Sequence, residues 1–89
     1  MHIYLLDGKD MTGRAEAYQV IARTLGFPAW FGRNLDALAD CLSELDADST
    51  VVFANTGALT ENLGPYGGKL LACFRDTARE FGFTYIEKA

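Results

Sequence analysis

Hydrophobic residues follow two patterns along the chain, one typical of β-strands and one typical of helices. Three short apolar or β-branched runs, each bounded by turn-forming residues, predict strands at His2–Leu6, Thr50–Ala54 and Phe83–Lys88. Between these runs, apolar residues recur at the i, i+3, i+4 and i+7 spacing of a helix with one buried face. The three apolar stripes are Tyr18, Ile21, Ala22, Leu25; Leu35, Leu38, Ala39, Leu42; and Leu70, Leu71, Phe74, Ala78, Phe81.

Residues that end or begin helices flank these stripes. Gly26 and Gly82 stand just after the first and third stripes, where a glycine commonly ends a helix. Asn34 precedes the second stripe and is a good N-cap, because its side chain can accept a hydrogen bond from the first helical turn. The stretch 55–69, "NTGALTENLGPYGGK", predicts either a loop or a loop that holds a short extra helix.

The order of these elements predicts the fold class. Strands separated by helices favour parallel pairing through right-handed crossovers. We therefore expect an α/β fold with a small three-stranded parallel sheet packed against three to four helices. No long linker divides the chain, and 49% of its residues are hydrophobic, so residues 1–89 are expected to form a single domain.

Composition indicates the cellular location of the protein. No run of eighteen apolar residues and no secretory leader is evident, so we expect neither a membrane span nor secretion. The only cysteines, Cys41 and Cys73, are too few for a secreted disulfide scaffold, which favours free thiols and a cytoplasmic location.

Acidic residues are concentrated in one segment. The net charge is −4, yet residues 36–48 hold five acids and no base, while the rest of the chain is close to neutral. Direct binding to nucleic acid is not expected, because phosphate contacts need clustered lysine and arginine. A cationic surface on another molecule is the natural complement.

The motifs of common enzymes are missing. His2 is the only histidine and lies in a predicted strand, which leaves little for a histidine triad or a zinc site. The stretch 64–69, "GPYGGK", resembles a phosphate loop, but Leu63 replaces the required glycine and Leu70 the Ser or Thr. No cofactor and no metal are predicted, and we expect no enzyme activity. A carboxylate catalytic or metal site at Asp36, Asp40 and perhaps Glu44 is the alternative from another class.

The acids on the second helix are spaced unfavourably. Asp36, Asp40, Ser43 and Glu44 are expected on an outward stripe beside the apolar one. Like charges four residues apart destabilise a helix by about 0.2–0.5 kcal/mol per pair. The helix dipole favours Asp36 in the first turn but not Asp40 or Glu44. Either the stripe only keeps the protein soluble, or its negative field serves a cationic partner.

Three aromatic residues precede this helix. Phe27, Trp30 and Phe31 lie within "FPAWFG", and we expect at least one of them in the core. Large rings beside charges are also typical of binding hot spots.

The segment "FPAWFGRNLDALADCL" resembles the barstar family, intracellular inhibitors of barnase-type microbial ribonucleases. "LTEN" (59–62) and "CFRDTARE" (73–80) resemble the same family more loosely. The resemblance implies a barstar-like fold in which an acidic helix and the preceding aromatic loop block the active site of the enzyme. It also implies a protein that is a monomer alone and forms a 1:1 heterodimer with a secreted basic ribonuclease. A barstar-like module that binds a different basic protein is the other alternative.

The resemblance also implies roles for individual residues. Asp40 falls at the central acid of the family, and Asp36 at the neighbouring acid one turn earlier. Asp76 matches an acid of the third helix, and Ala39 stands where an interface tryptophan is familiar. The residues expected to bind the partner are Trp30, Phe31, Gly32, Asn34, Asp36, Ala39, Asp40, Ser43, Glu44 and Asp76.

Overall fold

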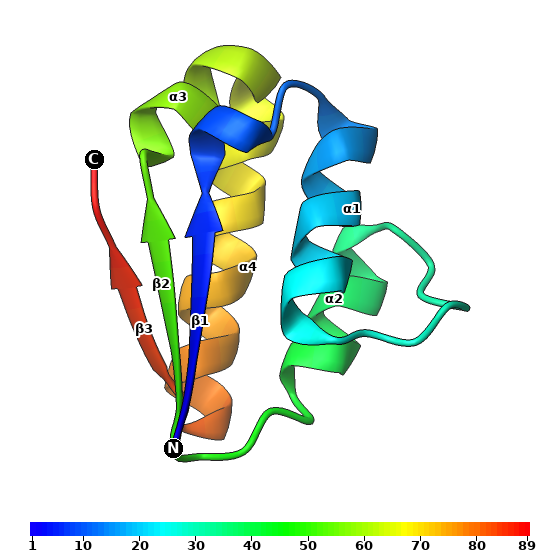
Figure 1. Ribbon diagram of the computed structural model, residues 1–89, viewed down its shortest axis with the longest axis vertical. Coiled ribbons are helices and arrows are strands. Elements are labelled where there is room, and N and C mark those ends of the chain that lie inside the picture. Colours follow the sequence, from blue (N-terminus) through cyan, green and yellow to red (C-terminus); the bar gives the residue numbers. More distant parts are fainter.

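The computed structural model describes residues 1–89, which form one three-stranded parallel sheet and four α-helices (Figure 1). This arrangement confirms the predicted α/β class. In chain order the elements are β1 (His2–Asp7), the 3-10 turn η1 (Gly8–Asp10), α1 (Arg14–Leu25), α2 (Leu35–Leu42), β2 (Ser49–Ala54), α3 (Thr56–Leu63), α4 (Pro65–Phe81) and β3 (Thr84–Glu87).

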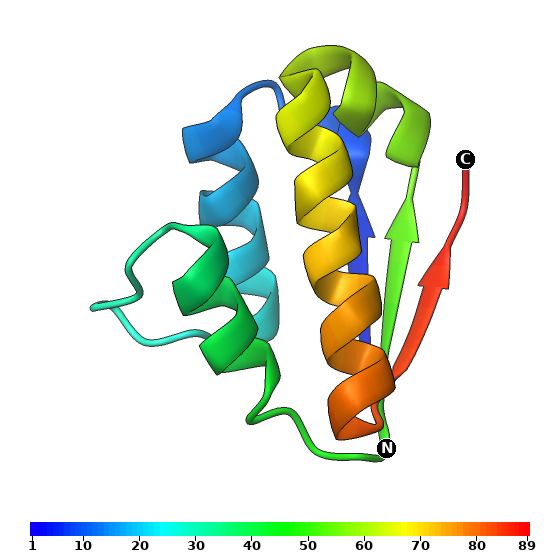
Figure 2. The same cartoon turned by 180° about the vertical axis from the view of Figure 1, so that it is seen from behind.

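The sheet is covered by helices on one face only. Its strand order is β1-β2-β3, with Leu5, Val52 and Ile86 side by side across the three strands. Both crossovers carry their helices to the same side, as two right-handed connections must in a sheet of this order (Figures 1 and 2). The other face therefore stays bare, and Ile3, Leu5 and Ile86 are exposed on it.

The predicted helix ends are confirmed. Gly26 follows α1 with φ of 72°, and Gly82 follows α4 with φ of 90°, both in the left-handed region that favours glycine. The Asn34 side chain caps α2 by accepting a hydrogen bond of 2.8 Å from the backbone N–H of Ala37.

The uncertain stretch 55–69 contains two helix segments rather than a loop. It holds the whole of α3 and the first turn of α4, with Pro65 at the first helical position, where its fixed φ suits a helix start. The prediction for Phe81 is wrong, because this residue is 47% exposed. The left-handed turn at Gly82 reverses the chain, so Phe83, 3% exposed, takes the core position instead.

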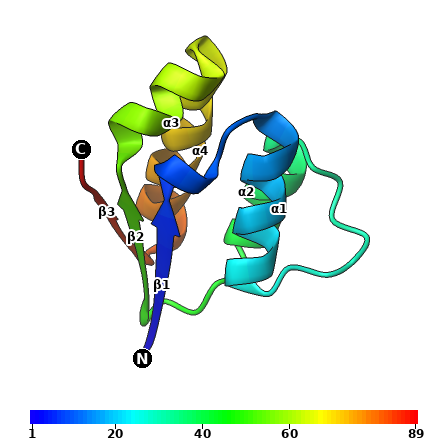
Figure 3. The same ribbon diagram turned by 45° about the horizontal axis from the view of Figure 1, so that its top comes forward.

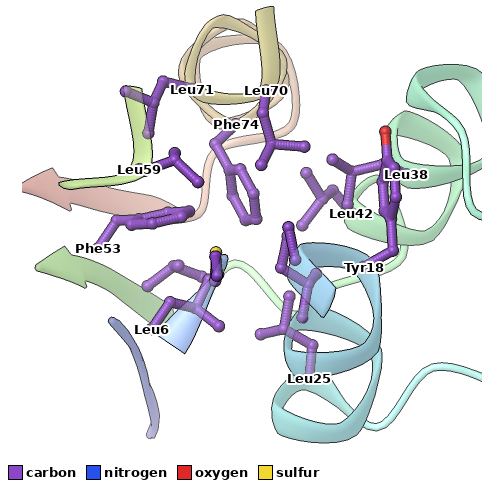
Figure 4. Close-up of a cluster of buried hydrophobic side chains, with 14 of the residues drawn as sticks. Leu6, Tyr18, Leu25, Leu38, Leu42, Phe53, Leu59, Leu70, Leu71 and Phe74 are labelled. Carbon is purple, nitrogen blue, oxygen red and sulfur yellow. The ribbon is translucent and has the colours of Figure 1, made fainter. Parts of the chain in front are cut away.

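The core lies between the sheet and the helices. Sixteen buried hydrophobic residues form one cluster. The rings of Phe53 on β2 and Phe74 on α4 meet edge to face with centroids 5.5 Å apart. Leu38 and Leu42 point from α2 into the same cluster (Figure 4). Leu38 and Leu42 hold α2 against the core, and the side of the helix that bears Asp36 and Asp40 stays exposed.

A polar contact joins the ends of β1 and β2. Asp7 Oδ1 accepts hydrogen bonds from the backbone N–H of Lys9 and from Asn55 Nδ2, at 2.9 and 2.8 Å. These two bonds, the one from Lys9 first, stabilise the carboxylate and hold the pKa of Asp7 below its usual 3.8. The neighbouring Gly8 lies so close to the backbone of Asn55 that an added Cβ would meet the Asn55 carbonyl oxygen at 2.2 Å.

Candidate protein interface

The acidic helix α2 is held between the core and α4. Leu38 and Leu42 are fully buried, whereas Asp36 and Asp40, one turn apart, are exposed. At the start of α2, the Cys73 thiol of α4 donates a hydrogen bond of 3.7 Å to the carbonyl oxygen of Leu35. The two aspartates are therefore exposed on a helix that is packed against the core and α4.

The carboxylates of Asp36 and Asp40 have no partner within the protein. The four ion pairs of the structure and the side-chain hydrogen bonds leave both groups out, and Glu44 as well. The later acids of the segment differ, since Asp48 lies 3.2 Å from the Met1 amino group and Asp46 lies 3.9 Å from His2 Nε2. The acidic segment thus divides into three unpaired acids and two that face internal partners.

Glu44 does not lie on the helix, contrary to the prediction of one helical stripe. The helix ends at Leu42, and Ser43 Oγ donates a hydrogen bond of 2.6 Å to the carbonyl oxygen of Asp40. This bond accompanies the end of the helix, with Ser43 at the C-terminal cap of α2. Glu44 follows in a turn, where its N–H donates to the carbonyl of Cys41. Only the pair Asp36 and Asp40 carries the repulsion of like charges at helical spacing.

The aromatic loop between α1 and α2 extends away from the helices (Figure 3). Its two adjacent aromatic residues have opposite environments, with Trp30 82% exposed and Phe31 8% exposed. The ring of Phe31 packs against Tyr18 of α1 and against Phe27, with centroid distances of 5.8 and 5.1 Å. The expectation that at least one aromatic residue lies in the core is confirmed. Phe31 anchors the loop from inside, and Trp30 supplies its exposed aromatic surface.

One surface depression joins the loop to α2. It is lined by Trp30, Asp40, Cys41, Ser43 and Glu44. Four of these residues belong to the predicted binding set, so the structure brings them together. Cys41, which stands between Asp40 and the buried Leu42, is the one member outside the predicted set, because a cysteine beside a core leucine in a helix is typical of a packing residue.

Gly32 and Asn34 shape the junction between loop and helix. Besides capping α2, Asn34 donates a hydrogen bond of 3.2 Å from Nδ2 to the carbonyl oxygen of Gly32. A Cβ on Gly32 would lie 3.3 Å from Ala37 Cβ, a tight contact in a closely packed turn. Ala39, also in the predicted set, is half-buried on α2.

Asp76 lies on α4, where its carboxylate is 3.7 Å from Arg79 Nη1. The pKa of the Cys73 thiol is raised mainly by burial, and the charges of Asp76 and Asp36 raise it further. Along the chain, Asp76 is three residues after Cys73 and Asp36 directly follows Leu35, the two residues that this thiol contact joins.

Two kinds of feature are absent from the structure. The structure contains no group of three or more His, Cys, Asp or Glu side chains placed to hold a metal ion. The alternative of a metal site at Asp36, Asp40 and Glu44 gains no support from this geometry. No helix has both the length and the apolar character needed to cross a membrane.

This chain is similar to a known protein family and to a bacterial relative. The family model described as "Barstar (barnase inhibitor)" matches residues 1–87. A protein of Bacillus subtilis (strain 168), named "Putative ribonuclease inhibitor YrdF", is 32% identical over 81 residues, which cover 90% of this chain and 89% of the relative. The family match includes the aromatic loop, α2 and α4 in full. The chain belongs to the barstar family.

Proposed function

We propose that this protein inhibits a secreted microbial ribonuclease of the barnase type by binding it one-to-one in the cytoplasm. In this proposal α2 and the aromatic loop cover the active site of the enzyme, and the inhibitor itself performs no chemistry. The observation that carries the proposal is the pair of unpaired carboxylates, Asp36 and Asp40, on a helix fixed by the core. The family membership supports it independently.

The charge argument concerns what a ribonuclease must offer. An enzyme that cleaves RNA binds phosphates, so its active site carries cationic side chains. Asp36 and Asp40 have no internal ion pair to break before they meet such cations. Their shared field also accelerates association, because opposite charges steer the two proteins together and salt screens this attraction.

The shape argument concerns Trp30. An exposed tryptophan ring is unusual on a free surface and is enriched among the residues that dominate binding energy. Here it lines the same depression as Asp40, so one partner group can contact an aromatic ring and a carboxylate together. A guanidinium or imidazole has the chemistry to do both.

The experiment is a titration of RNA cleavage by a panel of barnase-type ribonucleases with increasing inhibitor. We expect stoichiometric inhibition of at least one enzyme, with an association rate that falls steeply as salt rises. Asp40→Ala should weaken binding by about 2–5 kcal/mol, a range to which the barnase–barstar pair itself contributes, because the cations of the enzyme stay buried and unpaired. Asp36→Ala should act in the same direction.

Glu61→Ala is the matched control. Glu61 is an exposed acid on α3 outside every ion pair, so this variant makes the same change of charge away from α2. It should inhibit like the parent protein. If Asp40→Ala inhibited equally well, Asp40 would not be the central anchor. If no enzyme of the panel were inhibited, the proposed function would be wrong and a different basic protein would become the candidate partner.

A further inference from the structure

A second depression lies between the aromatic loop and α1. Arg23 of α1 and Arg33 of the loop line it, and Phe27 and Phe31 contribute apolar wall. It shares no residue with the depression formed by Trp30, Asp40 and Glu44. The aromatic loop therefore contributes to two distinct depressions, one lined by acids and one lined by arginines.

Neither arginine is neutralised within the protein. The ion pairs of the structure include neither Arg23 nor Arg33. Asp36 is only three residues after Arg33, yet no ion pair forms between them. Arg33 is the only basic residue between Arg23 and Lys69, so it alone gives the loop its positive charge.

The backbone at Arg33 is unusual. Its φ of 53° lies in the left-handed region, which glycine or asparagine adopts more readily than a long side chain. The chain nevertheless carries an arginine at this turn, directly before the asparagine that caps α2. Arg33 leads directly into the cap of α2 and is also one of the residues that line the depression beside α1.

We propose that the target ribonuclease places a carboxylate, from an aspartate or glutamate at the rim of its active site, in the depression lined by Arg23 and Arg33. This inference rests on the proposed function and specifies its partner. The inhibitor then presents negative charge from α2 and positive charge from the loop, and the enzyme presents the complementary pair. Arg33 is the residue that determines specificity.

Arg33 affects specificity because its positive charge repels cations of the enzyme and attracts carboxylates. Asp36 and Asp40 attract any enzyme with a basic active site. A cation at the edge of this surface disfavours enzymes whose rim is uniformly basic and favours those with a carboxylate opposite it. A planar guanidinium also suits a carboxylate, because it can donate two parallel hydrogen bonds. Discrimination among related enzymes then depends on one loop residue, while the acids of α2 supply general affinity.

The test measures the dissociation constant for the most tightly bound ribonuclease of the panel with Arg33→Glu, Arg33→Gln and Arg23→Gln. We expect Arg33→Glu to weaken binding by about tenfold or more, and the two glutamine variants to weaken it by several fold. High salt should reduce all three differences. Lys88→Glu is the matched control, because Lys88 is exposed after β3 and belongs to no ion pair, and it should change binding by less than about twofold.

The outcomes separate this inference from the proposed function. If Arg33→Glu binds as tightly as the parent or more tightly, while Asp40→Ala loses inhibition, the specificity role of Arg33 is wrong and the inhibitor function stands. If no ribonuclease of the panel is inhibited, both proposals are wrong. A melting curve for each variant tests whether it is folded, so that a loss of affinity can be assigned to the interface. Arg33→Gln removes the positive charge without adding a negative charge that would repel the carboxylate of the enzyme.

Discussion

The thiol of Cys73 on α4 lies 3.7 Å from the carbonyl oxygen of Leu35, where α2 begins. This contact joins two helices that also pack together through the core. It joins the two segments of the chain that carry Asp36 and Asp76, because Asp36 directly follows Leu35 and Asp76 is three residues after Cys73. We therefore expect the acidic surface to extend beyond α2.

Asp76 is expected to contribute to binding from the edge of this surface. Asp76→Ala should weaken inhibition, but less than Asp40→Ala, because Asp76 is already 3.7 Å from Arg79 Nη1. The free energy of unfolding should change by less than about 0.5–1 kcal/mol, as expected for an exposed ion pair. Inhibition assays and urea unfolding measure the two effects. Arg79→Ala, which frees Asp76, should leave inhibition equal or stronger, and weaker inhibition would contradict this role.

Substitutions at Trp30 and Phe31 should have different effects, the first on affinity and the second on stability. Trp30→Ala removes an 82% exposed ring, so stability should change by less than about 0.5 kcal/mol while affinity falls by about 2 kcal/mol or more. Phe31→Ala removes an 8% exposed ring packed on Tyr18, and should lower the free energy of unfolding by about 3 kcal/mol. Denaturant unfolding and inhibition of the same samples distinguish the two results. Equal effects of both variants on stability would contradict the assignment.

Asn34 should support α2 through its cap. Asn34→Ala removes the acceptor for the Ala37 N–H and should destabilise the protein by about 0.5–2 kcal/mol. Asn34→Asp keeps a side-chain oxygen at the same place and should retain most of the stability, so it is the control. Thermal unfolding followed by circular dichroism measures the difference. Similar melting temperatures for Asn34→Ala and the parent would show that the cap contributes little.

Asp7 should make stability depend on pH in the acidic range. Its two hydrogen bonds hold the pKa of the folded state below the usual 3.8. The folded state therefore binds this proton less readily than the unfolded state, so the stabilisation is present above 3.8 and is lost as pH falls through the folded pKa. Asp7→Asn should melt below the parent at neutral pH, and the gap should close in strong acid. A gap that stays constant with pH would contradict this interpretation.

Much of the fold could be predicted from local signals. Gly26, Asn34 and Gly82 marked helix ends because each fits a conformation or hydrogen bond that a helix end requires. The three apolar runs became strands with small shifts at their ends. The segment around Pro65 was harder, because the glycines beside it weaken the helical pattern, and its helix depends on packing against α3.

The site was predictable in its residue types but not in its details. Trp30 and Phe31 are neighbours in a loop without periodicity, so no pattern tells which ring is buried. Glu44 follows the helical spacing, but a single hydrogen bond from Ser43 to the Asp40 carbonyl accompanies the helix end. The left-handed backbone of Arg33 has no sequence signal, because arginine rarely adopts it.

The bare face of the sheet affects how the protein should be attached to a surface. Ile3, Leu5 and Ile86 form its exposed apolar side chains, and α2 belongs to the layer on the other side (Figure 2). Passive adsorption to a hydrophobic sensor through this face would leave α2 facing the solution, but adsorption through the exposed ring of Trp30 would cover the aromatic loop. Coupling through lysines avoids both the loop and α2, because Lys9, Lys69 and Lys88 all lie outside them. Lysine coupling is therefore the better way to immobilise the inhibitor for capture of a ribonuclease from solution.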